Sequence, residues 1–290
     1  MSKNQNDVVA LITAPRIASR WLDIETPLVE HALKDLNVQT EVVAWYEEND
    51  WSQYSLIVIR SPWDFYWHTN EFVAWVENMR GLPLLNGPDV LLWNLNKHYL
   101  DELKAAGIPT VETIYAKPGS SITFPSKEFV VKPVISEGAI NTARYRVDET
   151  AIAKDHVETL HAKGTEVMIQ PYLANVDVSG ERSLVFFNES FDHAIQKQAV
   201  LKPGEAYHVE HESHPDPVLY TPTPAELELA SAAIAAVPHN EKMLYARVDL
   251  AIDDNNNPIV MELELLDPVL FLHPSENSAH RYATAIASYL

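Results

Sequence analysis

"YARVDLAIDDNNNPIVMELELLDP", residues 245 to 268, reads as two short strands joined by a turn. Successive side chains of a strand point to opposite faces. In the first strand, Val248, Leu250 and Ile252 therefore share one face, and Arg247 and Asp249 share the other. The run "DDNNNP" between the strands is a dense turn signal. The stretch predicts an antiparallel hairpin with one apolar face and one charged face.

The second strand of this hairpin places Glu262 and Glu264 on one face. Closure with Ile252 opposite Ile259 places Asp249 opposite Glu262. Carboxylates that lie directly opposite each other repel, so a cation is expected to relieve them. The apolar face of this strand is expected to carry Ile259, Met261, Leu263 and Leu265.

By the same register, Arg247 lies opposite Glu264. Mg²⁺ takes carboxylate oxygens and completes its shell with water and phosphate. The charged face therefore suggests a magnesium–phosphate platform. A solvated hairpin face is the alternative, and the rest of the chain must decide between them.

Composition limits the classes of function. The chain has 290 residues, no cysteine, and a net charge of −20 from 41 acidic and 21 basic residues. The length permits one large domain or two to three small ones. Without cysteine there are no disulfides or thiol nucleophiles. A surface this acidic repels polyanions, so no nucleic-acid partner is expected.

The hydrophobic runs are short. The opening "MSKNQNDVVALITAP" has too short an apolar run for a signal peptide, and no run approaches the length of a membrane span. We predict a cytoplasmic protein with no membrane partner.

Residues 1–95 alternate strands and helices, which predicts a parallel sheet. Strands are expected at 7–13, 39–45 and 54–61, and helices at 18–36 and 70–81. Ligands of such sheets lie at the carboxyl ends of the strands, here "TAPR" at 13–16 and "RSPWDFYW" at 60–67. In the alternative, the aromatic residues of the second segment only cap the core. The substrate candidates are Arg16, Arg60, Ser61, Trp63 and Asp64.

The rest of the chain predicts antiparallel sheets flanked by helices. Gly107 and Pro109 end a helix that begins near Lys97, and strands follow within 128–147 and at 165–173. A hairpin is expected over 181–200. Helices are expected at 148–164, at 223–237, and at 274–290 with Ser275 or Ser278 as its cap.

Several residues of this second part suggest an anion or nucleotide site. Lys132 ends the apolar run "FVVKP" and needs a partner, and "SEGA" at 136–139 offers backbone N–H groups to a phosphate. Lys97 stands near a helix start, which also suits an anion. The proline-broken "IQPYL" could offer backbone groups to an adenine edge, and Glu181 could accept ribose hydroxyls. An ordinary strand and turn is the alternative for this last segment.

The order of these motifs resembles the ATP-grasp superfamily, in which two α+β subdomains hold ATP behind a Rossmann-like domain. The resemblance covers essentially the whole chain. It is most specific to the group of the cycloserine-forming O-ureido-D-serine cyclo-ligase, through "RSPWDFYWHTNEFVAW", "VVKPVISEGAINTARY", "SLVFFNESFDHAIQKQ" and "ELELLDPVLFL". It implies a Rossmann-like domain at 1–95, a subdomain with a phosphate lid at 96–172, and a subdomain with the Mg²⁺ site at 173–290.

The resemblance also implies roles for individual residues. Lys97 and Lys132 would contact ATP phosphates, Glu181 the ribose, and Arg247 the acyl-phosphate, with Lys197 also assigned to catalysis. Arg144 joins the substrate candidates. The phosphate lid would be Ser136, Glu137, Gly138 and Ala139, the adenine-side segment Gln170, Pro171, Tyr172 and Leu173, and the Mg²⁺ ligands Asp249, Glu262 and Glu264, with Mn²⁺ as the alternative metal.

Two segments depart from the superfamily pattern. Members often carry Asn where this chain has Glu264, and a third carboxylate still suits Mg²⁺. Relatives carry an arginine and a Gly-rich stretch where this chain reads "GEAYHVEHESH", which leaves the acceptor substrate open. His208, His211 and His214 in that segment suggest either a second metal site or a solvated loop.

Together these features predict an ATP-dependent ligase that joins a carboxylate to an amine through an acyl-phosphate. The substrate is expected to be small and amino-acid-like, and ring closure within one molecule is the version nearest to the relatives. A small-molecule kinase on the same fold and a nucleotide-binding regulator are the alternatives. A homodimer is left open.

Overall fold

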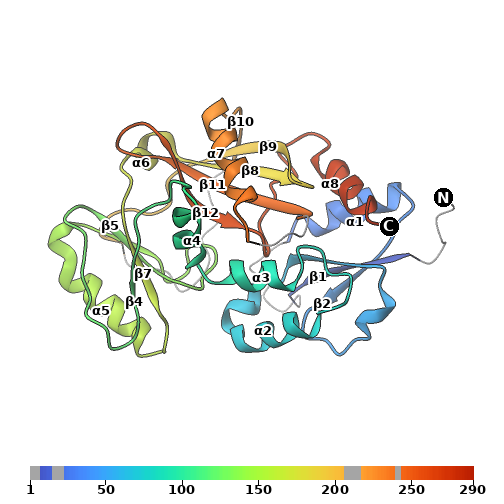
Figure 1. Cartoon of the computed structure of the whole chain (residues 1–290), viewed down its shortest axis with the longest axis horizontal. Helices are drawn as coiled ribbons and strands as arrows, with labels where there is room; N and C mark the ends of the chain where they lie inside the picture. Colours follow the sequence, from blue (N-terminus) through green and yellow to red (C-terminus); the bar gives the residue numbers. More distant parts are fainter. Residues whose placement is uncertain (1–6, 15–22, 206–216, 239–242) are drawn as a thin grey trace.

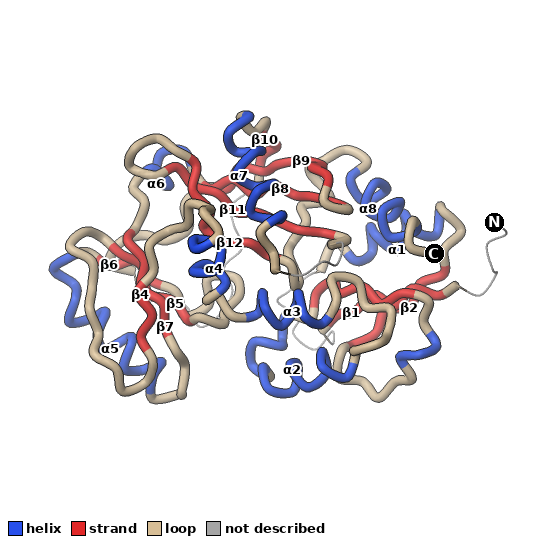
Figure 2. The backbone as a smooth tube through the Cα atoms, viewed as in Figure 1, coloured by secondary structure: helices blue, strands red, loops and turns tan. Residues whose placement is uncertain are grey.

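The computed structural model describes residues 7–14, 23–205, 217–238 and 243–290. It contains three sheets, which lie side by side in Figures 1 and 2. The expected Arg16 and the three histidines of 208–214 lie outside the described residues.

The first sheet is parallel, as predicted, with the strand order β2-β1-β3. Its strands are β1 (Val8–Thr13), β2 (Gln39–Ala44) and β3 (Leu56–Ser61). The described residues form three strands here, which is fewer than a doubly wound nucleotide-binding sheet has. The structure therefore shows a parallel α/β unit but not the expected Rossmann-like domain. Its helices are α1 (Thr26–Asp35), α2 (Thr69–Asn78) and α3 (Pro88–Leu95), and short 3₁₀ helices cover Trp51–Gln53 and Trp63–Trp67.

Two helices of this unit differ from the prediction. The described part of α1 begins only at Thr26, because Pro27 occupies its first turn and the segment before it is not helical at 23–25. Helix α3 was not predicted, although Pro88 at its first position is a typical helix start.

The second sheet is antiparallel, with the order β4-β7-β5-β6. Its strands are β4 (Ile114–Ala116), β5 (Phe129–Pro133), β6 (Ala143–Tyr145) and β7 (Val167–Pro171). Helix α4 (Tyr99–Ala105) precedes it, and a 3₁₀ turn at Val147–Glu149 leads into α5 (Thr150–His161). One face of α5 buries Ala153, Val157 and Leu160 in the core of this sheet.

The third sheet is also antiparallel, with the order β10-β9-β8-β11-β12. Its strands are β8 (Glu181–Phe187), β9 (Ser190–Lys197), β10 (Val218–Tyr220), β11 (Tyr245–Ile252) and β12 (Pro258–Glu264). Helix α7 (Pro224–Ala235) covers one face and starts with a Thr223–Glu226 capping box. The remaining helices are the short α6 (Asn175–Ser179) and α8 (Ser278–Ala287), which Asn277 precedes in place of the predicted serine caps.

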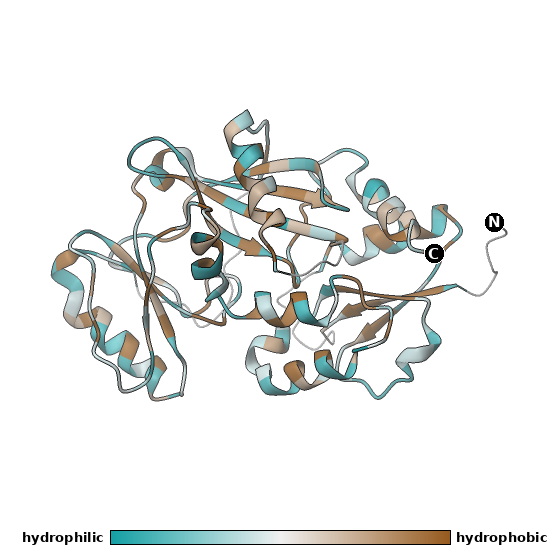
Figure 3. Ribbon diagram, viewed as in Figure 1, coloured by the Kyte–Doolittle hydropathy of each residue, from teal (hydrophilic) through white to brown (hydrophobic). Residues whose placement is uncertain are grey.

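The first and third sheets share a core. Helix α8 packs against α1, and Leu33 of α1 lies in the same apolar cluster as Tyr245 and Tyr282. Asn86, which is 1% exposed, adds three hydrogen bonds, from its amide to Tyr245 O and Leu265 O and from Leu244 N to its oxygen. Figure 3 shows the hydrophobic residues concentrated along the strands of the sheets. No helix among the described residues is long and apolar enough to cross a membrane.

Candidate active site

The charged hairpin forms from β11 and β12 as predicted, with one shift of register. Asp249 pairs with Glu262, and Arg247 pairs with Glu264. Ile252, however, lies opposite Pro258 rather than Ile259, because the register shifts between Asp249 and Leu250. A bulge at Met261 accounts for the shift, since this residue has no partner on β11.

The bulge also corrects the expected apolar face of β12. Leu263 lies in the core beneath α7, whereas Met261 packs in a different cluster on the side of the cavity. Strict alternation had placed both on one face. Because of the bulge, Met261 and Leu263 pack in different apolar clusters, although all of residues 261–264 reach the cavity lining.

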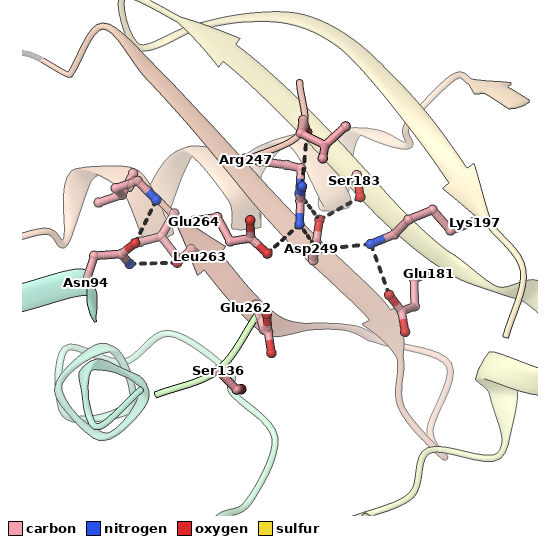
Figure 4. A network of polar contacts seen from close by, with 12 residues as sticks. Asn94, Ser136, Glu181, Ser183, Lys197, Arg247, Asp249, Glu262, Leu263 and Glu264 are labelled. Carbon is pink, nitrogen blue, oxygen red and sulfur yellow. Dashed lines mark hydrogen bonds and ion pairs between the residues drawn. The ribbon is translucent and has the colours of Figure 1, made fainter. Parts of the chain in front are cut away.

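Asp249 is the most fully bonded carboxylate of the site. One of its oxygens accepts from Ser183 Oγ (2.6 Å) and Arg247 Nε (3.0 Å), and the other from an Arg247 terminal nitrogen (3.0 Å) and Lys197 Nζ (3.1 Å) (Figure 4). Burial opposes ionisation, but the charges of Arg247 and Lys197 outweigh it and hold the pKa of Asp249 well below its usual range. All four acceptor positions of Asp249 are thus occupied by groups of the protein.

Glu262 is paired with a lysine of the neighbouring sheet. Lys132 Nζ lies 2.5 Å from Glu262 Oε1, and the two side chains are 11% and 22% exposed. Burial alone would raise the pKa of Glu262, but the charges of Lys132 and Lys97 lower it to about 2. The repulsion between Asp249 and Glu262 is therefore relieved by the protein's own cations, and not only by a metal as the sequence suggested.

Arg247 contacts both neighbouring carboxylates of the charged face and one backbone carbonyl. Besides Asp249, it bonds Glu264, and its remaining terminal nitrogen donates to Val269 O (3.0 Å). Lys197 joins Asp249 to Glu181, with its Nζ 3.2 Å from the Glu181 carboxylate. Both cations are buried.

These side chains line one cavity of about 210 Å³, between the second and third sheets. The cavity gathers every residue predicted to bind nucleotide or metal or to act in catalysis. These residues are Lys97, Lys132, Ser136, Glu137, Gly138, Ala139, Gln170, Pro171, Tyr172, Leu173, Glu181, Lys197, Arg247, Asp249, Glu262 and Glu264.

The walls of the cavity divide into an apolar part and a charged part. Tyr172 and Leu173 cluster with Met261 beyond the carboxyl end of β7, where an adenine ring was predicted. At the other part, Lys97 Nζ donates to Ser136 O (2.7 Å). Gly138 and Ala139 both have positive φ there, so the 136–139 segment curls back on itself.

The substrate candidates among the described residues do not line this cavity. Ser61 bonds Asp23, and Trp45 Nε1 donates to Asp64 (2.7 Å). Trp63 lies in the 3₁₀ helix that follows β3 and also does not line the cavity. Of the aromatic segment "WDFYW", only Phe65 reaches it.

Arg144 and Arg60 are also held away from the cavity. Arg144 bonds Glu128 and Asp177, and its guanidinium lies 3.5 Å from the centroid of the Tyr172 ring. It therefore contacts the back of a residue that lines the cavity. Arg60 is buried, with a terminal nitrogen 3.2 Å from Glu25 Oε2.

Sequence reasoning missed four polar residues of the cavity, which are Asn94, Tyr99, Thr142 and Asp267. Asn94, on the unpredicted α3, bonds Leu263 O and Leu265 N at 2.7 Å each and so completes the outer edge of β12. Asp267 stands three residues beyond Glu264, where the carboxylate run of "MELELLD" was the available signal. Burial and the charge of Glu264 raise the pKa of Asp267 to about 8.

The charge of the cavity suits a divalent cation. Its lining includes six carboxylates and four cationic side chains. Burial and the charge of Asp267 raise the pKa of Glu137 well above its usual range, and burial also raises the pKa of Glu264 despite Arg247. The raised pKa values mean that the neighbouring cations do not fully compensate these buried carboxylates. A hard cation such as Mg²⁺, which binds carboxylate oxygens, would supply the missing positive charge.

Among the described residues, no three acidic or histidine side chains form a ready-made metal site. In Figure 4, Asp249 and Glu264 turn toward Arg247, and Glu181 turns toward Lys197. Within the described part of the chain, Glu262 and Glu264 each accept through Oε1 only, so each retains an oxygen for a metal. Asp249 does not, which makes it the poorest fit of the predicted ligands.

Comparison with known proteins gives a consistent relationship. Residues 9–86 match the family model "D-cycloserine synthetase DcsG, N-terminal domain". The cycloserine biosynthesis protein DcsG of Streptomyces lavendulae is 33% identical over 304 aligned residues, covering 98% of this chain and 99% of the relative.

Solved structures extend the comparison. The crystal structure of D-cycloserine synthetase DcsG superposes with a TM-score of 0.86 at 31% identity, over 97% of this chain and 99% of that one. The D-alanine–D-alanine ligase of Bacillus anthracis, complexed with ATP, has a TM-score of 0.64 at 15% identity, over 98% and 97%. The ATP-grasp ligase PsnB, complexed with a minimal precursor, Mg and ADP, has a TM-score of 0.63 at 13% identity, over 100% and 99%. The last two show a common fold only.

Proposed function

The chain belongs to the DcsG family of ATP-grasp ligases, and from this premise we propose the reaction and the substrate class of its cavity. It is an ATP-dependent ligase. We propose that its substrate is a small amino-acid-like carboxylate and that a nitrogen of the same molecule closes a ring. The family relationship supports this choice, because the relative is named for cycloserine, a cyclic product.

The observation that carries the proposal is the convergence of the predicted residues on one cavity with an apolar wall and a charged wall. Tyr172, Leu173 and Met261 offer a surface for a base, and Gln170 and Glu181 lie at its polar margin. Lys97 and Lys132 then face the phosphates, beside the 136–139 segment. We propose the same division of the chain as before, with substrate at 1–95, the phosphate lid within 96–172, and the metal side within 173–290.

Bound Mg²⁺ would neutralise the negative charge of the ATP phosphates and allow them to lie near the acidic wall of the cavity. We propose Glu262 and Glu264 as its ligands, because each keeps an oxygen that the protein does not use. Asp249 can join them only when Arg247 or Lys197 releases it. Until then it orients both cations.

The proposed reaction has two steps. The substrate carboxylate oxygen attacks the γ-phosphorus, the bond to the β-phosphate oxygen breaks, and ADP leaves. The nitrogen then attacks the acyl carbon, phosphate leaves, and the nitrogen loses a proton. Arg247 and Lys197 would stabilise the charge that develops on the transferred phosphoryl group and the acyl oxygen.

The test is ADP release from the purified chain with ATP and Mg²⁺, screened against amino acids and their ureido and hydroxamate derivatives. We expect one substrate class to trigger equimolar ADP, phosphate and a cyclised product detected by mass spectrometry. Lys132→Met is the matched inactive control. A stable phosphorylated product without ligation would favour the kinase, and ATP binding without turnover on any substrate would favour the regulator.

The substrate roles of Arg16, Ser61, Trp63, Asp64 and Arg144 remain proposals, as do the Rossmann-like assignment, the homodimer and the cytoplasmic location. Ser61, Trp63, Asp64 and Arg144 do not line the cavity, so these four residues would act on substrate only from its margin.

A further inference from the structure

Glu25 is a buried carboxylate outside the cavity, and it joins the first sheet to the segment that follows β12. Its Oε1 accepts from Leu272 N (2.8 Å), and its Oε2 accepts from Leu270 N (2.9 Å) and from Arg60 (3.2 Å). The Glu25 and Arg60 side chains are 6% and 2% exposed. A buried carboxylate with two backbone donors and one guanidinium fixes the position of all three.

Between its two backbone donors lies a strained residue. Phe271 has a φ of 51°. A bulky residue in the left-handed region is strained and persists only where its surroundings impose it. Here the Glu25 carboxylate holds the amides on both sides of Phe271.

The same segment contacts Arg247 in two ways. Val269 O accepts from a terminal nitrogen of Arg247 (3.0 Å), and the Arg247 guanidinium lies 5.7 Å from the centroid of the Phe271 ring. On its other side, Arg247 is drawn by Asp249 and Glu264. Val269 and Phe271 therefore contact the Arg247 guanidinium in addition to its two carboxylate partners, and help to fix its position.

We propose that Glu25 is a positioning residue for Arg247. It holds the 269–272 segment in the strained conformation that places the Val269 carbonyl and the Phe271 ring against the guanidinium. Without it, Phe271 relaxes, Arg247 loses the contacts from the 269–272 segment, and the guanidinium shifts toward Asp249 and Glu264 and out of its position against the reacting group. This inference rests on the proposed function, because it requires Arg247 to act on that group.

The test is a double-mutant cycle on kcat for product formation, with the full-length protein. Glu25→Gln should lower kcat about 10- to 100-fold, the range expected when a catalytic group is displaced by about 1 Å. The KM for ATP and the thermal shift on ATP addition should stay near wild type. In the Arg247→Met background, Glu25→Gln should change kcat by less than about twofold, because its target is already absent.

Glu226→Gln is the matched control. Glu226 is as buried as Glu25 and pairs with the buried Arg182, but it lies on the α7 side of the third sheet. The Glu226→Gln variant should be destabilised as Glu25→Gln is, but its kcat per folded molecule should stay at the wild-type value. An equal loss of kcat in this control would overturn the proposal, as would unchanged kcat in Glu25→Gln or an undiminished effect in the Arg247→Met background.

If Glu25→Gln does not fold, the cycle is run with Glu25→Asp, which keeps the negative charge beside Arg60 but shortens the reach of the carboxylate to Leu270 N and Leu272 N. The same loss of kcat, absent in the Arg247→Met background, is expected, and an unchanged kcat refutes the proposal. Failure of the proposed function looks different: the wild type would form no ATP-dependent product, or Arg247→Met alone would leave kcat unchanged.

Discussion

Glu262→Gln separates the stability of the charged hairpin from its chemistry. In the wild type, the Glu262 carboxylate lies 2.5 Å from Lys132 Nζ, and both side chains are mostly buried. A hydrogen bond to a charged group contributes about 1.5–3 kcal/mol. Relief of the repulsion with Asp249 returns only about a few tenths of a kcal/mol. The metal-free variant should therefore be less stable by about 1–2 kcal/mol, which corresponds to a fall in Tm of about 3–6 °C.

The pH dependence of this loss follows from the pKa of Glu262, which is lowered to about 2 in the folded protein. A carboxylate with a lowered pKa stabilises the fold fully above its unfolded pKa, about 4.3. That stabilisation disappears as the pH falls toward 2. The difference in unfolding free energy between wild type and Glu262→Gln should thus be constant from pH 6 to 8 and should shrink below about pH 4.5.

Activity is measured on the same variant as ADP release. If Glu262 holds Mg²⁺, the rate should fall by a factor on the order of 10² to 10³, the range for removal of one charge-stabilising group. Near-normal turnover would refute the metal role of Glu262. An unchanged or higher Tm without metal would refute the pairing with Lys132 as the source of stability.

Three further predictions follow from the cavity and its margins. ATP with Mg²⁺ at 100 times its Kd should stabilise the fold by about 2.7 kcal/mol, and no shift of Tm at millimolar ATP or a non-hydrolysable analogue would contradict the nucleotide site. Because the pKa of Asp267 is raised to about 8, its carboxyl binds a proton in the folded state that the unfolded chain has lost, so metal-free stability should fall as the pH rises from about 4 to 8. Asp267→Asn should flatten that slope in denaturant titrations, and a slope identical to wild type would show that another group is responsible. Asp64→Ala should impair substrate use and leave the KM for ATP unchanged, whereas an equal loss of ATP affinity would contradict the assignment of residues 1–95 to substrate.

The sequence was sufficient to predict the charged hairpin, because alternation and one strong turn signal define it locally. It placed Asp249 opposite Glu262, but it did not predict the bulge at Met261, which no residue type marks. The pairing of Lys132 with Glu262 joins residues 130 positions apart on two sheets. Such a contact depends on how the sheets pack, which a local pattern does not contain.

The candidate site divides in the same way. The nucleotide and metal residues follow strand ends and motifs, and the structure brings all of them into one cavity. Most substrate residues were inferred from a general rule about parallel sheets, and the described ones lie outside the cavity. Arg144, on the second sheet, bonds Glu128 and Asp177. Asn94 was missed because α3 is apolar nearly throughout and its helical period is weak.

The core shared by the first and third sheets determines how a ligand can enter. Asn86, Glu25 and the packing of α8 on α1 fasten these two sheets into what should behave as one rigid body. The second sheet meets the third through ion pairs, such as Lys132 with Glu262 and Arg144 with Asp177, and through Val134 and Met168, which lie in the apolar cluster of the third sheet. Ion pairs can open and re-form at far lower cost than a buried core can separate. Access to the cavity should therefore depend on a hinge at the two ends of the second sheet, and nucleotide should slow hydrogen exchange there while leaving the α1–α8 interface unchanged.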